Sequence, residues 1–205
     1  MIYIFGDSHG MFSLKNLSLP HINKATPSVT MHRVGRDNNI INYQNEYDNE
    51  NNVIILCFGE VDCRCHIEKQ KHIQNIDEDI IISILVYNYF NTIQNNIKQS
   101  KKIIIFAIIP PVDIEKYINK HGDYANKTHP FPVLGTNNDR IRYTNKMNNL
   151  LKYLCDKHSY IYFDPYNFYK DEMGCLNEKY ADDTLVHVKD NDYIINEMIK
   201  LINSL

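Results

Sequence analysis

The chain has 205 residues, of which 43% are hydrophobic and 23% charged, a globular composition that excludes a disordered chain or a fibrous rod. Its length suits one domain, so residues 1–205 are expected to fold as a single unit. With 22 Lys and Arg against 25 Asp and Glu, the net charge of -3 provides no basic field to attract nucleic acid or an anionic membrane.

The apolar segments are short. Residues 2–5 end at a Gly-Asp pair and have no basic region before them, so we expect no export signal and a cytoplasmic location. No run approaches the roughly 20 residues that span a bilayer, so no membrane contact is expected. The five cysteines are then expected to be free thiols. The Cys-Arg-Cys-His run at 63–66 lacks a second ligand pair at zinc-finger spacing, so no metal is expected there.

Short β-rich runs ending near Gly, Asp or Pro recur along the chain and predict buried strands. In chain order they are residues 2–5, 29–34, 53–58, 102–109 and 160–163. Apolar residues at helical spacing predict helices over 77–98, 140–155 and about 191–205. Alternating strands and helices imply parallel pairing with helices on both faces. The predicted fold class is therefore α/β, a three-layer α/β/α sandwich with a mostly parallel sheet.

Residues 110–138 contain several prolines and no sustained period, which predicts a long loop. The loop follows a predicted strand, and ligands of open α/β sheets bind at the carboxyl ends of the strands. We interpret it as a lid or a wall of a substrate site.

A serine lies directly after the first predicted strand, in the run Gly6-Asp7-Ser8-His9-Gly10. A Ser hydroxyl there stands at the edge where nucleophiles of α/β enzymes lie, but it needs a base, normally a His oriented by a carboxylate. His187 is the candidate base and Asp183, four residues earlier, its candidate orienting group. The alternative is that Ser8 caps a helix and that His187 has no catalytic role.

Three short motifs together resemble the SGNH, or GDSL-type, hydrolase superfamily. The run at 6–9 resembles its GDS block with Ser8 as nucleophile, Gly35 stands as the glycine of the second block, and Asp183 with His187 resembles the final Asp/His block. The resemblance implies a flavodoxin-like α/β/α sandwich and the hydrolysis or transfer of esters without a metal or other cofactor.

A further block follows the predicted strand at 53–58. Its sequence, FGEVDCRCH at 58–66, resembles a branch of SGNH-like proteins with a GEIDCR-type block. Through this block, Glu60, Asp62 and Arg64 are expected to lie beside Ser8 as oxyanion-stabilising or substrate-binding residues.

The chain departs from the family at the oxyanion hole. The third block is usually Gly-x-Asn-Asp, in which the Asn donates to the oxyanion, whereas Val61 has no donor. We expect the backbone N–H groups of Ser8 and Gly35 to remain as donors, with Arg64 as the substitute side chain. The alternative is that Arg64 forms an ion pair with Glu60 or a neighbouring acid.

Two other classes of function stay open. The run at 6–10 also fits the GDxHG opening of metallophosphoesterases, in which Asp7 and His9 would bind metal, but the later His-containing segments of that family are missing. The other alternative is a catalytically weak, glycan-binding domain of the same fold. It is suggested by Val61, which stands where the family has an oxyanion-binding Asn.

The loop at 110–138 carries Tyr, Lys, His and Phe side chains rather than an aliphatic wall. A polar substrate with a small acyl group suits this composition better than a long-chain lipid. We therefore expect an esterase that acts on small acyl esters, such as the acetyl esters of a glycan.

Overall fold

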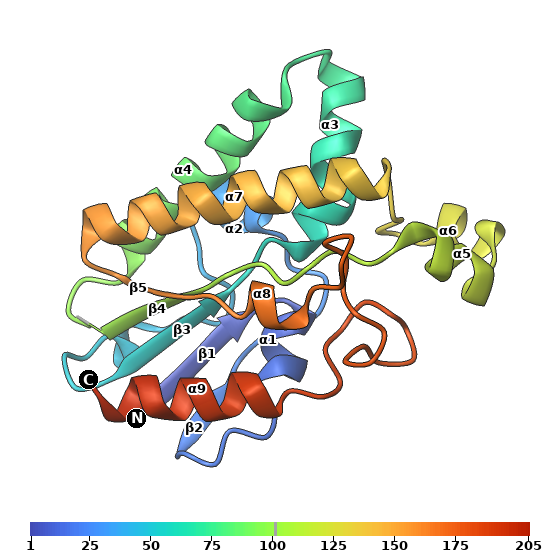
Figure 1. The fold of residues 1–205 in the computed structure, drawn as a ribbon. Coiled ribbons are helices and arrows are strands. Elements are labelled where there is room, and N and C mark those ends of the chain that lie inside the picture. Colours follow the sequence, from blue (N-terminus) through green and yellow to red (C-terminus); the bar gives the residue numbers. More distant parts are fainter. Residues whose placement is uncertain (101) are drawn as a thin grey trace.

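The structure, a computed structural model that describes residues 1–100 and 102–205, is built around a parallel sheet of five strands (Figure 1). The strands are β1 (Ile2–Gly6), β2 (His21–Asn23), β3 (Val53–Cys57), β4 (Lys102–Phe106) and β5 (Ile161–Phe163). Their order is β2-β1-β3-β4-β5, and every neighbouring pair is parallel. The prediction of an α/β fold with a parallel sheet is confirmed.

Helices cover both faces of the sheet. The longer ones are α2 (Met31–Asp37), α3 (Ile67–Gln74), α4 (Glu78–Asn96), α5 (Ile114–His121), α7 (Asn137–His158) and α9 (Asp192–Asn203). The short ones are α1 (Ser8–Ser13), α6 (Asp123–Thr128), α8 (Tyr166–Tyr169), a 3-10 helix (Asn45–Tyr47) and a π-helical turn (Asp62–His66). Helices α2, α4 and α7 lie on one side of the sheet and α9 on the other (Figure 1).

Alternating strand residues feed two separate cores, as the two-residue period of a strand requires. Ile54 and Leu56 of β3 pack with α2, α4 and α7, whereas Ile55 of the same strand packs with Met198 of α9. All five residues of β3 are buried, which is typical of a central parallel strand covered on both faces.

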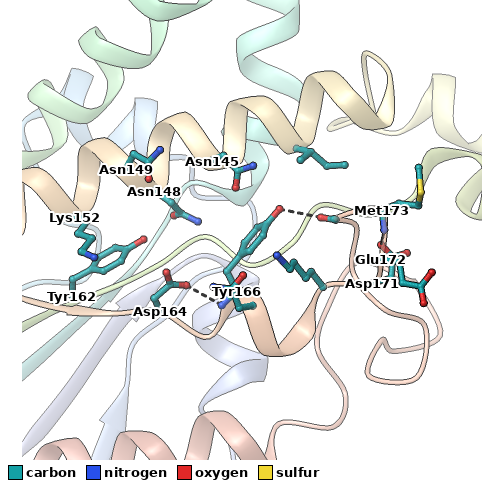
Figure 2. Close-up of a pocket in the computed structure, with 14 residues that line it drawn as sticks. Asn145, Asn148, Asn149, Lys152, Tyr162, Asp164, Tyr166, Asp171, Glu172 and Met173 are labelled. Carbon is teal, nitrogen blue, oxygen red and sulfur yellow. Dashed lines mark hydrogen bonds between the residues drawn. The ribbon is translucent and has the colours of Figure 1, made fainter.

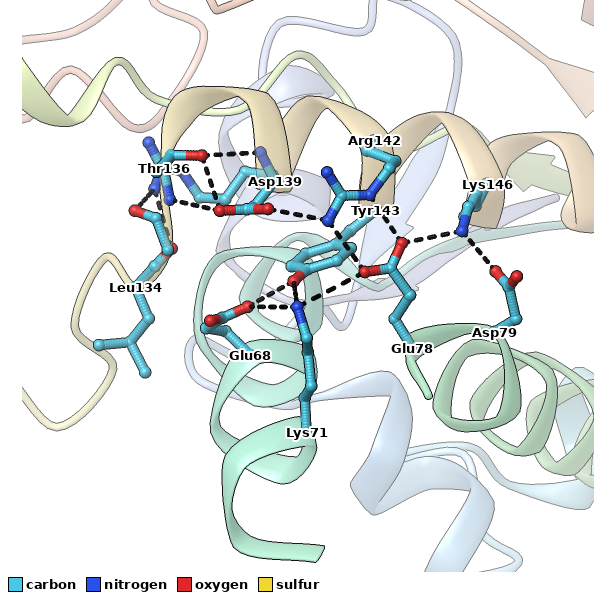
Figure 3. Close-up of polar contacts among 12 residues, drawn as sticks. Glu68, Lys71, Glu78, Asp79, Leu134, Thr136, Asp139, Arg142, Tyr143 and Lys146 are labelled. Atoms are coloured by element: carbon cyan, nitrogen blue, oxygen red, sulfur yellow. Dashed lines mark hydrogen bonds and ion pairs between the residues drawn. The ribbon is translucent and has the colours of Figure 1, made fainter. Parts of the chain in front are cut away.

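A polar network joins α3, α4 and α7 on the outer side of the first core (Figure 3). The carboxylate of Glu78 accepts hydrogen bonds from Arg142 at 2.7 Å and from Lys146 at 2.8 Å. The Tyr143 hydroxyl donates to Glu68 of α3. The buried carboxylate of Glu78 thus has two cationic partners on α7, and these contacts join the three helices.

The predicted strand at 29–34 is wrong, since this segment begins α2. The side chain of Thr30 accepts a hydrogen bond from the backbone N–H of Arg33, so Thr30 caps a helix rather than continuing a strand. The strand that pairs with the outer side of β1 is instead β2, which has three partly exposed residues at the sheet edge. A strand this short has no apolar alternation from which it could be predicted.

Gly35, predicted as an oxyanion donor, lies within α2 and faces α4. A Cβ atom at Gly35 would lie 2.8 Å from the Cβ of Asn88 and 3.2 Å from its carbonyl carbon. The prediction for Gly35 is therefore wrong: the residue permits close packing of two helices and does not line the cleft beside Ser8.

Gly35→Ala is expected to lower the free energy of unfolding by about 1–3 kcal/mol, because the added methyl overpacks the contact between α2 and α4. Helix propensity alone predicts the opposite sign, a gain of up to about 1 kcal/mol. Urea unfolding measures the difference. In an Asn88→Gly background, which removes the opposing Cβ, most of the loss should disappear. A stabilised Gly35→Ala variant would contradict the packing role.

The predicted loop at 110–138 contains two helices, α5 and α6, and we call residues 110–138 the cap. Asn126 binds the backbone of Val133 twice, through its amide nitrogen at 3.1 Å and its amide oxygen at 2.7 Å. At the base of the cap, the N–H of Ile114 donates to the side chain of Asn137 at 2.9 Å. The cap is thus ordered by side-chain hydrogen bonds that a search for periodicity does not detect.

Within the described part of the chain, none of the helices combines the length and the apolar character needed to cross a lipid bilayer.

Candidate active site

Ser8 is placed by the close approach of β1 to β3. A Cβ atom at Gly6 would lie 2.3 Å from the carbonyl oxygen of Cys57, so only glycine fits at the end of β1. The N–H of Asp7 then donates to that carbonyl at 3.0 Å, and the Asp7 carboxylate accepts the N–H of His9 at 2.8 Å. These bonds set Ser8 at the first turn of α1, at the carboxyl edge of the sheet.

The structure brings Ser8 and His187 together. His187 Nε2 lies 2.9 Å from Ser8 Oγ, although 179 positions separate the two residues in the sequence. The other ring nitrogen, Nδ1, lies 3.1 Å from Oδ2 of Asp182. A hydroxyl, an imidazole and a carboxylate are therefore connected in the order that nucleophilic catalysis requires.

The carboxylate beside His187 is Asp182, so the prediction of Asp183 for this place is wrong. Ala181 and Val188 form an antiparallel bridge, and the N–H of Asp182 donates to the His187 carbonyl at 2.8 Å. Backbone pairing of this kind sets residue 182 opposite residue 187. Asp183 lies one step farther round the loop, with an exposed side chain.

The electrostatic surroundings suit His187 as a base. Burial and, after it, the charge of His9 lower its pKa to about 4, although Asp182 acts to raise it. Burial acts to raise the pKa of Asp182, but a hydrogen bond from Thr184 and the charge of His187 outweigh it, so the pKa lies below its usual value. At neutral pH the imidazole is therefore unprotonated and the carboxylate is ionised.

Glu60 and Arg64, from the turn after β3, form a buried ion pair behind Ser8. Arg64 Nε lies 3.0 Å from Glu60 Oε1, as the alternative for Arg64 anticipated. Arg64 also borders the cleft, and its Nη1 donates to the carbonyl of Phe131 in the cap at 3.2 Å. One guanidinium thus joins the turn after β3 to the cap at the place where Ser8 is exposed.

Asp62 does not face the cleft. It is fully buried, and its carboxylate accepts the backbone N–H groups of Met31 at 2.7 Å and His32 at 3.2 Å. Burial raises the pKa of Asp62 to about 7, against the effect of these two hydrogen bonds. The prediction that Asp62 binds substrate is wrong: its carboxylate caps the first turn of α2.

A cleft of about 460 Å³ opens above Ser8 and His187. It is lined by residues of the cap, of the turn after β3, of α1 and of two loops: Ser8, Phe12, Pro27, Ser28, Val61, Arg64, Tyr117, His121, His129, Phe131, Thr184, Val186 and His187. Outside the cap the wall combines the apolar side chains of Phe12, Pro27, Val61 and Val186 with polar ones, and the cap contributes two histidines, a tyrosine and a phenylalanine. No carboxylate is among these lining residues.

Val61 lines this cleft, at the place where the family resemblance expects the side chain of an Asn. Ser28 lines it as well, and its φ of 67° lies in the left-handed region. The loop that carries Ser28 follows β2, so the chain after the second strand reaches the cleft through Ser28 rather than through Gly35.

A second cleft of about 400 Å³ lies between α7, the end of β5 and the loop after α8 (Figure 2). Its walls are polar, and its floor is fixed by Tyr166, which donates from its hydroxyl to the Gly174 carbonyl at 3.0 Å. This second cleft shares no lining residue with the cleft above Ser8.

No protein-family model and no curated protein matches the chain. Solved structures do. A proposed platelet activating factor from Streptococcus pneumonia has a TM-score of 0.63 at 16% identity, covering 98% of this chain and 82% of that one. A proposed acylhydrolase from Bacteroides fragilis has a TM-score of 0.58 at 14% identity, covering 99% and 86%. A GDSL-like lipase from Bacteroides thetaiotaomicron has a TM-score of 0.59 at 13% identity, covering 100% and 88%.

One of these structures is that of a GDSL-like lipase, and the likeness to it extends over the whole chain. The chain therefore has the fold of the SGNH, or GDSL-type, hydrolases, and the fold implied by the sequence resemblance is confirmed. At these identities the likeness concerns the backbone architecture and not the reaction.

Two residues beside the catalytic groups did not emerge from the sequence in these positions. Asp182 lies one residue farther from His187 than Asp183 does, and the spacing of the family's final block favours the nearer carboxylate. His9 was considered only as a metal ligand, yet its ring lies 4.8 Å from that of His187, measured between centroids. In the sequence, the feature that marks His9 is its position directly after the nucleophile Ser8. In the structure, the acid beside it, Glu60, is buried.

Proposed function

We propose that the chain is a serine esterase or acyl-transfer enzyme that acts on small acyl esters, such as acetyl esters, of a polar substrate such as a glycan. The observation that carries the proposal is the connection of Ser8, His187 and Asp182 at the floor of the cleft, with 2.9 Å and 3.1 Å between successive polar atoms. The fold shared with GDSL-type hydrolases supports the same class of reaction.

In the first half of the reaction, Ser8 Oγ attacks the ester carbonyl while His187 Nε2 takes the hydroxyl proton. Asp182 stabilises the resulting imidazolium through Nδ1. The proton then passes to the leaving alkoxide, which departs as an alcohol and leaves the acyl group on Ser8. In the second half, water or an acceptor alcohol gives its proton to His187 and takes the acyl group, which restores the Ser8 hydroxyl.

The negative charge on the carbonyl oxygen needs donors. The backbone N–H of Ser8 is at the nucleophile itself, and Arg64 is the cationic side chain of the cleft wall on this side. Val61 contributes no hydrogen bond. The guanidinium of Arg64 is paired with Glu60, so it is already oriented before substrate binds.

The cleft wall suggests the substrate class. Phe12, Val61 and Val186 form an apolar surface beside the catalytic groups, suited to a short acyl chain. Tyr117 and His121 of α5 face the same cleft and suit hydroxyl-rich groups. We therefore place the acyl group against the apolar residues and the alcohol portion of the ester against the cap.

The purified protein should hydrolyse 4-nitrophenyl acetate and release acetate from an acetylated oligosaccharide, with kcat/KM falling as the acyl chain is lengthened to octanoate. Excess EDTA should leave the rate unchanged, because the proposed reaction uses only side chains and backbone N–H groups. The measurement is initial rate by absorbance and by acetate assay, with 4-nitrophenyl phosphate as the competing substrate class.

Two outcomes would favour the other classes. Loss of activity in EDTA together with faster hydrolysis of the phosphate ester would indicate a metallophosphoesterase. Binding of the acetylated oligosaccharide without turnover of any ester would indicate a glycan-binding domain of this fold. The absence of a side-chain hydrogen-bond donor at Val61 is the observation that supports this alternative.

A further inference from the structure

A chain of buried charged side chains lies directly behind the catalytic groups. His9, Glu60 and Arg64 are 2%, 5% and 7% exposed. His9 Nε2 lies 3.3 Å from one carboxylate oxygen of Glu60, and Arg64 Nε lies 3.0 Å from the other. Burying ionisable groups is unfavourable even when they are paired, and apolar residues of similar size are often as stable. Such a cluster therefore calls for an explanation other than stability.

The ring of His9 contacts the ring of His187. Their centroids are 4.8 Å apart, with 43° between the ring planes. Phe12 contacts His187 as well, at 4.7 Å and 52°. His187 thus lies against two rings of α1, while Asp182 and Ser8 occupy its two nitrogens.

The charges around His9 favour its protonated form. The groups that face it are Asp7 beside it in the chain, Glu60 and Arg64 from the turn after β3, and His187 from the last loop. Burial acts to lower the pKa of His9, but the contact with Glu60 and the nearby Asp7 raise it above its usual value against Arg64. Burial also acts against the ionised form of Glu60, yet Arg64 and His9 lower the pKa of Glu60 to about 2.

The surroundings of His187, in contrast to those of His9, favour the unprotonated form of its ring. It faces Asp182 on its own loop, His9 on α1 and Glu60 after β3. A positive charge on the neighbouring ring disfavours a second one, because like charges separated by about 5 Å in a poorly solvated site repel strongly.

We propose that His9 is a positioning residue that holds His187 in its unprotonated, proton-accepting form, and that it thereby sets the lower pH limit of the esterase reaction. This inference rests on the proposed function. The chain from Arg64 through Glu60 to His9 keeps the charge of His9 in place, and His9 acts on substrate only through His187. The expected result is an enzyme that works at mildly acidic pH, where an ordinary catalytic histidine is protonated.

The sign of the effect is fixed by the geometry. Replacing His9 with Gln keeps a donor for Glu60 but removes a positive charge beside His187. It also leaves the negative charge of Glu60 less neutralised. Both changes favour protonated His187, so the acid limb of kcat/KM, which reports the base of the free enzyme, should move to higher pH.

The test is the pH dependence of kcat/KM for 4-nitrophenyl acetate between pH 4 and 9. In the unaltered protein the acid limb, the pH range in which kcat/KM decreases with acidification, should lie below pH 6. In His9→Gln, and in His9→Phe, it should move up by about one pH unit or more, with a plateau at high pH within about tenfold of the original. His72→Gln is the matched control, since His72 pairs with Glu68 at 2.7 Å on the exposed surface, and it should shift nothing.

Titration of His187 by nuclear magnetic resonance in the Ser8→Ala protein, with and without His9→Gln, measures the same shift without turnover. If the unaltered protein hydrolyses no ester, the proposed function fails while this titration still tests His9. If the esterase is active but the acid limb and the His187 titration stay in place in both His9 variants, the inference is overturned and His9 only supports the fold. A variant that does not fold leaves the unaltered protein as the test: a His187 titration midpoint at or above 6.5 would overturn the inference.

Discussion

Replacing Ser8 with alanine is expected to lower kcat for acetyl-ester hydrolysis by at least about 10³-fold, because the only oxygen positioned against His187 Nε2 is removed. The Ser8 hydroxyl bonds to no other described side chain than His187, so the fold should be retained, with a change in the free energy of unfolding of about 1 kcal/mol or less. Initial rates, normalised to folded protein by circular dichroism, provide the measurement.

Ser13→Ala is the matched control for Ser8→Ala. Ser13 ends the same helix, α1, and its hydroxyl is buried with no hydrogen-bond partner among the described residues. Its removal should leave kcat unchanged and the stability equal or slightly higher, since no bond is lost. If Ser8→Ala retained activity within tenfold of the unaltered protein, Ser8 would not be the nucleophile.

Asp182→Asn is expected to lower kcat by about 10²–10⁴-fold, whereas Asp183→Asn should change it by no more than about twofold. An amide at position 182 offers an N–H to His187 Nδ1, which favours the ring tautomer that carries its proton on Nε2 and therefore cannot accept one from Ser8. The amide at 183 faces solvent and affects neither nitrogen.

The two Asn variants form a self-controlled pair, since the same chemical change is made at adjacent positions. They are compared by kcat at pH 8, where His187 is unprotonated in every variant. A larger loss in Asp183→Asn than in Asp182→Asn would show that the loop closes differently in solution and would restore the assignment made from the sequence.

The parts of the fold that could be predicted are those with long apolar runs. The runs predicted at 53–58 and 102–109 contain the strands β3 (53–57) and β4 (102–106), whose faces are both buried, and the helix predicted at 77–98 is present as α4. The run at 29–34 misled because Val29 and Thr30 favour strands locally, whereas Thr30 caps α2. Tertiary contact with α4 decides the conformation there, and a local pattern does not contain that contact.

Part of the candidate site could also be predicted from the sequence, and part could not. Ser8 and His187 stand in short motifs with a chemical rationale, and the structure brings them together at 2.9 Å. Asp182 could not be separated from Asp183 by spacing, because the deciding feature is an antiparallel bridge between Ala181 and Val188. The family resemblance assigns Gly35 as the glycine of the second block, but the structure places it inside α2, packed against α4.

The cap has a consequence for how this protein diversifies. Its two ends meet where Ile114 binds Asn137 at 2.9 Å, and its far side is tied to the sheet edge through Leu134, whose N–H donates to the Arg64 carbonyl at 2.9 Å. Between these ties, Tyr117 and His121 line the cleft, and Tyr117 and Val133 pack in a small cluster with Leu185 and Val186 that is separate from both main cores. Related chains can therefore exchange this segment for another of different shape, and so change which alcohols they accept, while inheriting the sheet and the catalytic residues unaltered.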